Sequence, residues 1–409
     1  MASDRSMASQ AAAATTRDSR WVMLDEAVCR KTDSVVAGAK TMAESATSAG
    51  QNLRIYFGHT APPASSSLYY DWAGSAPSAE EYAGEPEIIA AHGDSVLFEM
   101  NHKLRRSSTV TSDYFVYRAG VARPPSLSLL PEFHCGTLNK WKTGILRRGD
   151  DELLVVQLDL VTKRRETAHL CVLQLSRREW ELKPEVPIVL DKGTTSDEEM
   201  QRQVSRSTTM AIPVGDRFMC WVDYSRSGLL MCNMTEASPK LRYMPLPVIP
   251  HDGYDYYDDG NVPDKEDSRN TRAAGSSTLR FVSIDPRCCC GHSPSRSSCP
   301  QGRISFTVTT WTLILRTDEE MSWVKEGMIN CEEIWALPGY EGLPRVHPEF
   351  PVLSSADPDV VCFMVREENF VSLEERKTFL VEFDTRSKAL RSVIRGSASP
   401  RNLPSKLHC

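Results

Sequence analysis

The hydrophobic pattern of the chain is that of short strands separated by polar turns. Residues 218–222 (Phe-Met-Cys-Trp-Val) are apolar without interruption, a polar turn follows, and residues 229–232 (Leu-Leu-Met-Cys) are apolar again. Short runs that are apolar on both faces predict strands buried between neighbouring sheets. The next run, at 241–246, alternates more and ends between Pro245 and Pro247. Prolines cannot donate to a strand ladder, so this run fits a strand that ends at a sheet edge.

The same grouping of two or three strands recurs along the chain. The first strands of three successive groups begin at residues 153, 217 and 279. A serial array of sheet units predicts stacked blades, because each unit buries its apolar faces against its neighbours. We therefore expect a mainly β fold, an irregular β-propeller of about five or six blades over 21–395. Two β-sandwich-like domains are the alternative, and a strand near Trp21 is expected to close the ring by pairing with C-terminal strands.

Other segments lack the strand pattern. We expect disordered tails at 1–20 and 396–409, because both are rich in Ala, Ser and other small or polar residues. Pro, Ser, Ala and Gly dominate 59–87, which predicts a loop with little regular structure. Two insertions between strand runs, 251–275 and 287–303, are predicted to be exposed. A short helix is predicted at 196–204, with Ser196 as its N-cap, and the pattern of 319–327 is ambiguous.

Several blocks of the sequence resemble an uncharacterised protein family known from plants, especially grasses, as domain of unknown function 1618. The resemblance spans about 213–365, and the opening Trp21-Val22-Met23-Leu24-Asp25 is also similar to the start of such proteins. The family has no assigned reaction, so the resemblance implies no activity. The blocks lie at 218–224 (FMCWVDY), 228–232 (GLLMC), 239–247 (PKLRYMPLP), 309–313 (TTWTL), 343–352 (LPRVHPEFPV) and 357–361 (DPDVV).

Composition narrows the class of protein. Hydrophobic residues make up 41% of the 409 residues, charged residues 25%, and the formal net charge is -6. These values are typical of a globular chain with a sizeable core. No long basic run and no apolar stretch of about 18 residues occurs, so we expect neither nucleic acid nor a membrane as partner.

Twelve cysteines occur in a chain whose first residues lack the apolar segment of a secretory signal. This combination predicts reduced thiols and a cytoplasmic or nuclear location. Five of the cysteines lie in or beside apolar runs and are predicted to pack as small buried side chains: Cys135, Cys171, Cys220, Cys232 and Cys362.

The sharpest chemical feature is a cluster in the second insertion. Cys288, Cys290, His292 and Cys299 supply four side chains of the type that bind zinc. The spacing lacks a second well-formed Cys pair, so a flexible loop with incidental thiols is the competing interpretation. The acidic, tyrosine-rich 251–267 lacks the ligand order of a calcium loop. We expect it to be a solvated insertion, with a docking role for a basic partner as the alternative.

No catalytic motif is recognisable in the sequence. A nucleophile elbow, a phosphate-binding glycine loop and a dinucleotide fingerprint are all missing, and the histidines are scattered. We expect a non-catalytic protein-interaction scaffold or receptor whose protein partners the sequence does not identify. The alternatives are an enzyme with its site in the propeller channel and a metal-binding regulatory module that uses the cysteine-rich loop.

Overall fold

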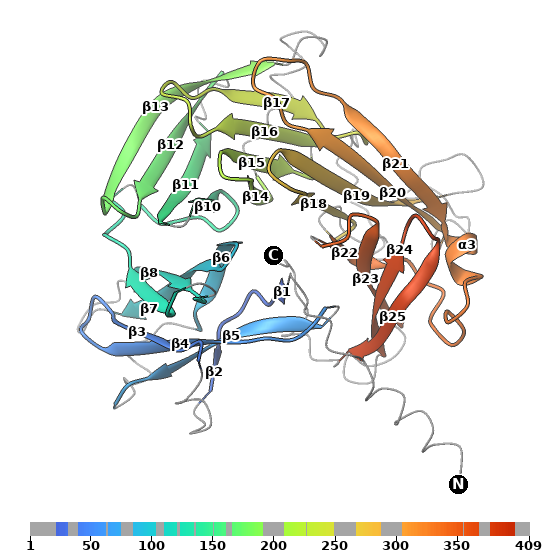
Figure 1. Cartoon of the computed structure of the whole chain (residues 1–409), viewed down its shortest axis with the longest axis horizontal. Coiled ribbons are helices and arrows are strands. Elements are labelled where there is room, and N and C mark those ends of the chain that lie inside the picture. Colours follow the sequence, from blue (N-terminus) through green and yellow to red (C-terminus); the bar gives the residue numbers. More distant parts are fainter. Residues whose placement is uncertain are drawn as a thin grey trace.

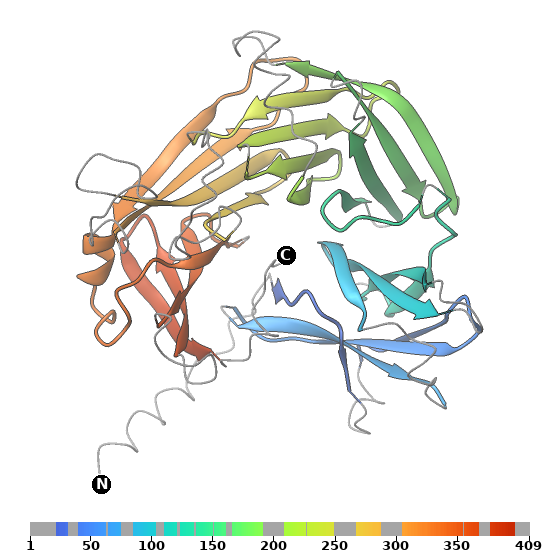
Figure 2. The same cartoon turned by 180° about the vertical axis from the view of Figure 1, so that it is seen from behind.

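The chain folds as a ring of β-sheets. The computed structural model describes residues 22–31, 40–62, 64–74, 85–103, 110–120, 123–134, 136–149, 151–160, 166–190, 208–225, 227–248, 267–287, 305–354, 356–367 and 377–396. Of these residues, 60% are in strands and 2% in helix. Small sheets surround a common centre in both views of Figures 1 and 2. The predicted mainly β, propeller-like fold is therefore confirmed.

Six blades follow one another along the chain. In blades 2 to 6 the first strand lies nearest the centre and the fourth at the rim (Figure 1). The blades are blade 1, β1 (Met23–Leu24), β2 (Cys29–Arg30), β3 (Ala43–Ala46), β4 (Asn52–Gly58) and β5 (Ser65–Trp72); blade 2, β6 (Glu87–His92), β7 (Ser95–Lys103), β8 (Val110–Arg118) and β9 (Ser126–Leu129); blade 3, β10 (Thr143–Arg148), β11 (Glu152–Leu160), β12 (Thr167–Gln174) and β13 (Glu179–Leu190); blade 4, β14 (Met210–Val214), β15 (Phe218–Asp223), β16 (Gly228–Asn233) and β17 (Leu241–Pro245); blade 5, β18 (Arg269–Ala273), β19 (Thr278–Pro286), β20 (Phe306–Ile314) and β21 (Trp323–Asn330); and blade 6, β22 (Glu349–Leu353), β23 (Val360–Arg366), β24 (Thr378–Asp384) and β25 (Ala389–Gly396).

The core lies between the blades, because each blade packs on two neighbours. Leu146 and Leu154 of blade 3 and Met219 and Trp221 of blade 4 belong to one buried cluster. The Trp221 indole N–H also donates to the Lys142 carbonyl across this junction, at 2.8 Å. The middle strands of a blade are covered on both sides, which explains why β15 and β16 are buried at every position. The rim strands of blades 3 and 4 pair in parallel and join these blades into one eight-stranded sheet.

The ring closes by a different route from the one predicted. β1 pairs in parallel with β5 of its own blade, Met23 opposite Ser65, so the expected pairing with C-terminal strands is wrong. Met23 instead packs against Val352 and Cys362 of blade 6. Among the described residues these three form the buried apolar cluster of the closing junction. The other five junctions each contain a much larger cluster.

Strand direction gives the ring two different faces. In blades 2 to 6 successive strands are antiparallel, so the first-to-second and third-to-fourth connections share one face. We call this the turn face, and the longest of its connections is 315–322. The opposite face, here called the loop face, holds the second-to-third and blade-to-blade connections. These include 191–209, 246–268, 287–305 and 331–348.

Two local predictions need correction, and a third falls outside the described residues. Ser65–Trp72 forms β5, although 59–87 was expected to be a loop, because its alternation of polar and buried residues is that of a half-buried strand. Arg269–Ala273 of the expected insertion 251–275 forms the inner strand of blade 5. The described part of the chain contains one helix, α3 (Cys331–Trp335), which begins in a capping box of Asn330 and Glu333. The helix predicted at 196–204 lies outside the described residues.

Candidate functional site

The predicted zinc ligands lie where the structure gives no positions. Cys288, Cys290, His292 and Cys299 all fall in the β19–β20 connection, outside the described residues. Within the described ranges, no group of three His, Cys, Asp or Glu side chains is arranged to hold a metal ion. The zinc site therefore stays a prediction.

The remaining cysteines pack as predicted where they are described. Cys171, Cys220, Cys232 and Cys362 are buried and form no disulfide, and Cys135 falls outside the described residues. Burial raises the pKa of the Cys220 thiol, and the neighbouring Cys232 adds to the shift. Burial is also the main cause that raises the pKa of Cys232 to about 12. Thiols in such surroundings stay protonated and inert, so these residues act as small core side chains.

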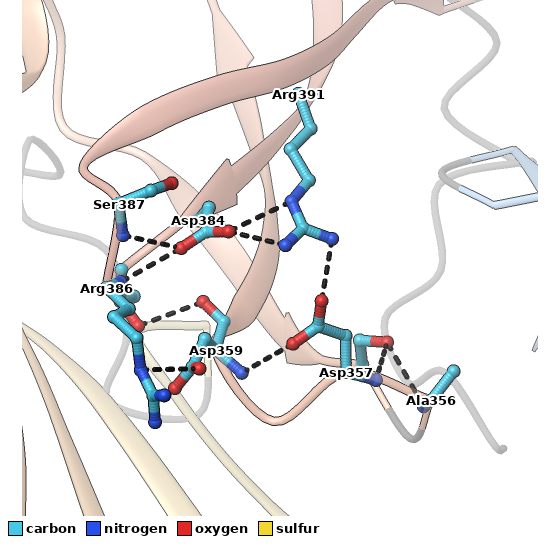
Figure 3. A network of polar contacts seen from close by, with 9 residues as sticks. Ala356, Asp357, Asp359, Asp384, Arg386, Ser387 and Arg391 are labelled. Atoms are coloured by element: carbon cyan, nitrogen blue, oxygen red, sulfur yellow. Dashed lines mark hydrogen bonds and ion pairs between the residues drawn. The ribbon is translucent and has the colours of Figure 1, made fainter.

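The turn face of blade 6 carries a dense polar network (Figure 3). Asp384 accepts hydrogen bonds from the amides of Arg386 and Ser387 and from the Arg391 guanidinium. Arg391 also bonds Asp357 at 2.7 Å. Burial opposes ionisation of Asp384, but these hydrogen bonds outweigh it and lower the pKa of its carboxyl. Because the groups satisfy one another, the network fastens the β22–β23 turn to the β24–β25 turn and is structural.

Two histidines are packed as neutral rings. His92 accepts the Arg147 amide N–H on Nδ1 at 3.0 Å. Burial, with a smaller effect of the Arg147 charge, lowers the pKa of His92 to about 4. His347 contacts the Pro348 carbonyl and lies edge-on to Phe306. Burial lowers the pKa of His347 to about 4 as well. Both are weak bases in these surroundings, and their role is packing.

A charged bridge lies at the loop face where the inner strands begin. Lys140 donates to Glu26 at 2.9 Å and to Glu87 at 3.1 Å, and so connects the beginnings of blades 1, 2 and 3. The ammonium also lies over the Trp141 ring, 5.0 Å from its centroid. Burial opposes the charge of Lys140, but the two carboxylates outweigh it and raise the pKa of the ammonium. Because the ammonium is held by two carboxylates, this bridge ties the three blades together and Lys140 is a poor acid or base.

A second polar group at the loop face brings together a serine, a histidine and an aspartate from blades 1 and 2. Ser48 lies at the exposed tip of the β3–β4 turn, whereas His102 of β7 and Asp113 of β8 are only 4% and 5% exposed. The Ser48 Oγ lies 3.4 Å from His102 Nε2. Asp113 Oδ2 accepts the Ser48 amide N–H at 2.9 Å and lies 3.8 Å from His102 Nδ1.

Sequence reasoning did not find this group, because its members are far apart in the chain and meet only where blade 2 packs on blade 1. The local signal was weak: His102 ends a strand and Ser48 sits in a short turn closed by Gly50, which has a φ of 81°. No spacing rule connects the three residues. Packing of the two blades is what creates the arrangement.

The fold and these sites define a propeller-like β protein of six blades. Residues 221–362 match the model of a protein family of unknown function, DUF1618. The resemblance seen in the sequence blocks is thus confirmed, and the expected plant origin stays a prediction. No curated protein matches the chain. No helix in the described part of the chain is long and apolar enough to cross a membrane.

Solved structures resemble the chain only distantly. The periplasmic gluconolactonase of Pseudomonas aeruginosa is 10% identical with a TM-score of 0.34, over 90% of this chain and 87% of that one. The β-propeller domain of the trilobed protease of Pyrococcus furiosus is 8% identical with a TM-score of 0.33, over 78% and 72%. A putative 6-phosphogluconolactonase of Bacteroides uniformis is 11% identical with a TM-score of 0.33, over 86% and 85%.

Proposed function

We propose that the chain is a protein-interaction scaffold or receptor that presents its loop face to protein partners. The observation that supports this is the unequal distribution of connections between the two faces. The turn face has connections such as 149–151 and 215–217, whereas the loop face has 246–268, 287–305 and 331–348. Long connections on a rigid sheet framework are where binding residues concentrate.

The proposal places the chain in the cytoplasm or nucleus, where buried free thiols such as Cys220 and Cys232 remain reduced.

The rigid part of the proposed binding surface would be supplied by the ring of blades itself. The Lys140 bridge fixes how blades 1, 2 and 3 begin at the loop face. Connections that start from fixed strand ends lose less conformational freedom on binding than the same segments in a free chain.

Insertion variants test which face binds. A small folded tag inserted after residue 260, on the loop face, should abolish capture of reproducible protein partners from native tissue. The same tag inserted after residue 149, in a turn of the opposite face, is the matched control and should leave capture intact. Equal capture by both variants, or no reproducible partner for the parent chain, would count against the proposal.

A zinc-dependent module in the β19–β20 connection remains a second proposal, supported by the four ligand-type side chains of 288–299. The purified, metal-free chain should bind one zinc ion when zinc is added, and its thiols should release protons as they bind it. Cys290→Ser with Cys299→Ser should remove binding, and Cys29→Ser, outside the cluster, should not. Failure of the parent chain to bind zinc at micromolar concentration would end this proposal.

A further inference from the structure

Ser48 is held at the surface by a closed turn. The Thr47 amide donates to the Gln51 carbonyl at 2.8 Å, and the Gly50 amide donates to the Thr47 carbonyl at 3.0 Å. The Thr47 hydroxyl accepts the Gln51 amide as well. These bonds fix the turn from both ends, so the Ser48 side chain is presented in one place and reaches solvent.

The two groups behind Ser48 are buried and polar. Burying an imidazole and a carboxylate between blades costs free energy unless each gains a polar partner. Asp113 gains one from the Ser48 amide, and His102 faces the Ser48 hydroxyl on one side and the Asp113 carboxylate on the other. The imidazole therefore faces the exposed hydroxyl with Nε2 and the buried carboxylate with Nδ1.

We propose that Ser48, His102 and Asp113 form a nucleophile, base and carboxylate group that hydrolyses small carboxylic esters at the loop face. This order of groups defines an acyl-transfer site by geometry and role, whatever the fold. The 3.4 Å contact between Ser48 and His102 is a long hydrogen bond. The 3.8 Å separation between His102 Nδ1 and Asp113 Oδ2 is longer than a hydrogen bond, so the two groups must approach for Asp113 to stabilise the imidazolium that forms in the reaction.

The reaction balances with an ester and water alone. The Ser48 Oγ attacks the ester carbonyl carbon while its proton passes to His102 Nε2, and the bond to the leaving oxygen breaks as that oxygen takes the proton. Water then attacks the acyl group on Ser48, giving its proton to His102, and the carboxylic acid leaves as Ser48 regains the proton. Asp113 stabilises the charged imidazole in both halves.

A fluorophosphonate probe tests the site directly, because it reacts with activated serines and leaves ordinary ones untouched. The full chain is incubated with the probe and digested, and the labelled peptide is identified by mass spectrometry. We expect the label on Ser48 and slow hydrolysis of p-nitrophenyl acetate. Ser48→Ala should remove both, and His102→Gln should slow labelling by about a hundredfold. Ser45→Ala, three residues away on the same hairpin, is the control and should change neither.

Two results would overturn the inference. The first is a parent chain that leaves Ser48 unlabelled under conditions that label a known serine hydrolase completely, which needs no variant and so does not depend on refolding. The second is labelling of Ser48 that His102→Gln leaves unchanged, since an exposed serine without a base would behave in this way. Thermal unfolding of each variant separates loss of reaction from loss of fold.

Discussion

Gly144→Ala tests how closely blades 3 and 4 pack. A Cβ added at Gly144 in β10 would lie 2.3 Å from the Met219 Cε and 3.2 Å from the Ala211 Cβ. Carbon atoms in contact are normally about 3.5–4.0 Å apart, so Met219 must move by more than an ångström. Met219 is fully buried in the junction and has no open side to move into. Overpacking of this kind costs about 1–3 kcal/mol of unfolding free energy.

Gly144→Ala should raise the unfolding free energy, not lower it, when Met219 is shortened. Met219→Ala alone should cost about 2–5 kcal/mol, because it leaves a cavity against Gly144. In that background the new methyl group of Gly144→Ala enters the vacated space, and the loss of glycine freedom in the unfolded chain contributes about 0.4–1 kcal/mol. The two residues are therefore expected to couple by about 2–3 kcal/mol.

Guanidinium unfolding of the four proteins, followed by tryptophan fluorescence, measures the coupling. Gly327→Ala is the matched control, because its Cβ would meet nothing closer than the Thr310 Oγ1 at 3.5 Å. Gly327→Ala should change the unfolding free energy by the same amount in the parent and in Met219→Ala. If Gly144→Ala also destabilises both proteins equally, Met219 does not fill the space at Gly144, and the packing described for this junction is refuted.

Three further outcomes follow from the structure. Met23→Ala should lower the melting temperature less than Met219→Ala, because Met23 packs in the small closing cluster and Met219 in a large one; an equal loss would show that the closing junction is as well packed as the others. Asp384→Asn should destabilise the chain at neutral pH. The pKa of Asp384 is lowered in the fold, so its carboxylate stabilises the folded chain above the ordinary aspartate range and loses this effect on acidification. The melting temperatures of parent and variant should therefore converge toward pH 3. A difference in melting temperature that stays constant with pH would contradict this. Because burial holds the pKa of His92 at about 4, and the unfolded side chain titrates near pH 6.5, stability should fall as the pH drops from about 6.5 to 4, and His92→Asn should flatten that fall in a melting series.

The sequence predicts the middle strands of the blades well and the inner strands poorly. β15 and β16 are buried on both faces, so they contain the continuous apolar runs 218–222 and 229–232, which are easily recognised. The inner strand β18 reads Arg-Asn-Thr-Arg-Ala, without a hydrophobic pattern. Its Arg269 is nevertheless buried, because the guanidinium bonds the Tyr224 carbonyl and the Ser227 hydroxyl of blade 4. Tertiary hydrogen bonds therefore decide that this segment is a strand, and local pattern does not show them.

The closing of the ring was mispredicted for a related reason. The apolar start of the chain was correctly taken as a strand, but its partner depends on which edge is free. In the structure β1 pairs with an edge of β5 within its own blade, and its Met23 side chain packs against blade 6. Short strands of two residues carry no register information that a sequence could reveal.

The family match and the two loop-face proposals concern different parts of the ring. The match runs from Trp221 in β15 to Cys362 in β23, and so begins inside blade 4 and ends inside blade 6. It cannot be a separate folding unit, because Trp221 packs into blade 3 and β17 pairs with β13 outside the match. The matched segment carries the connections 246–268, 287–305 and 331–348, on which the scaffold proposal rests. Ser48, His102 and Asp113 all lie before it. An esterase activity would therefore belong to this chain's first two blades, outside the segment that matches the family model, whereas the proposed partner surface would lie largely within that segment.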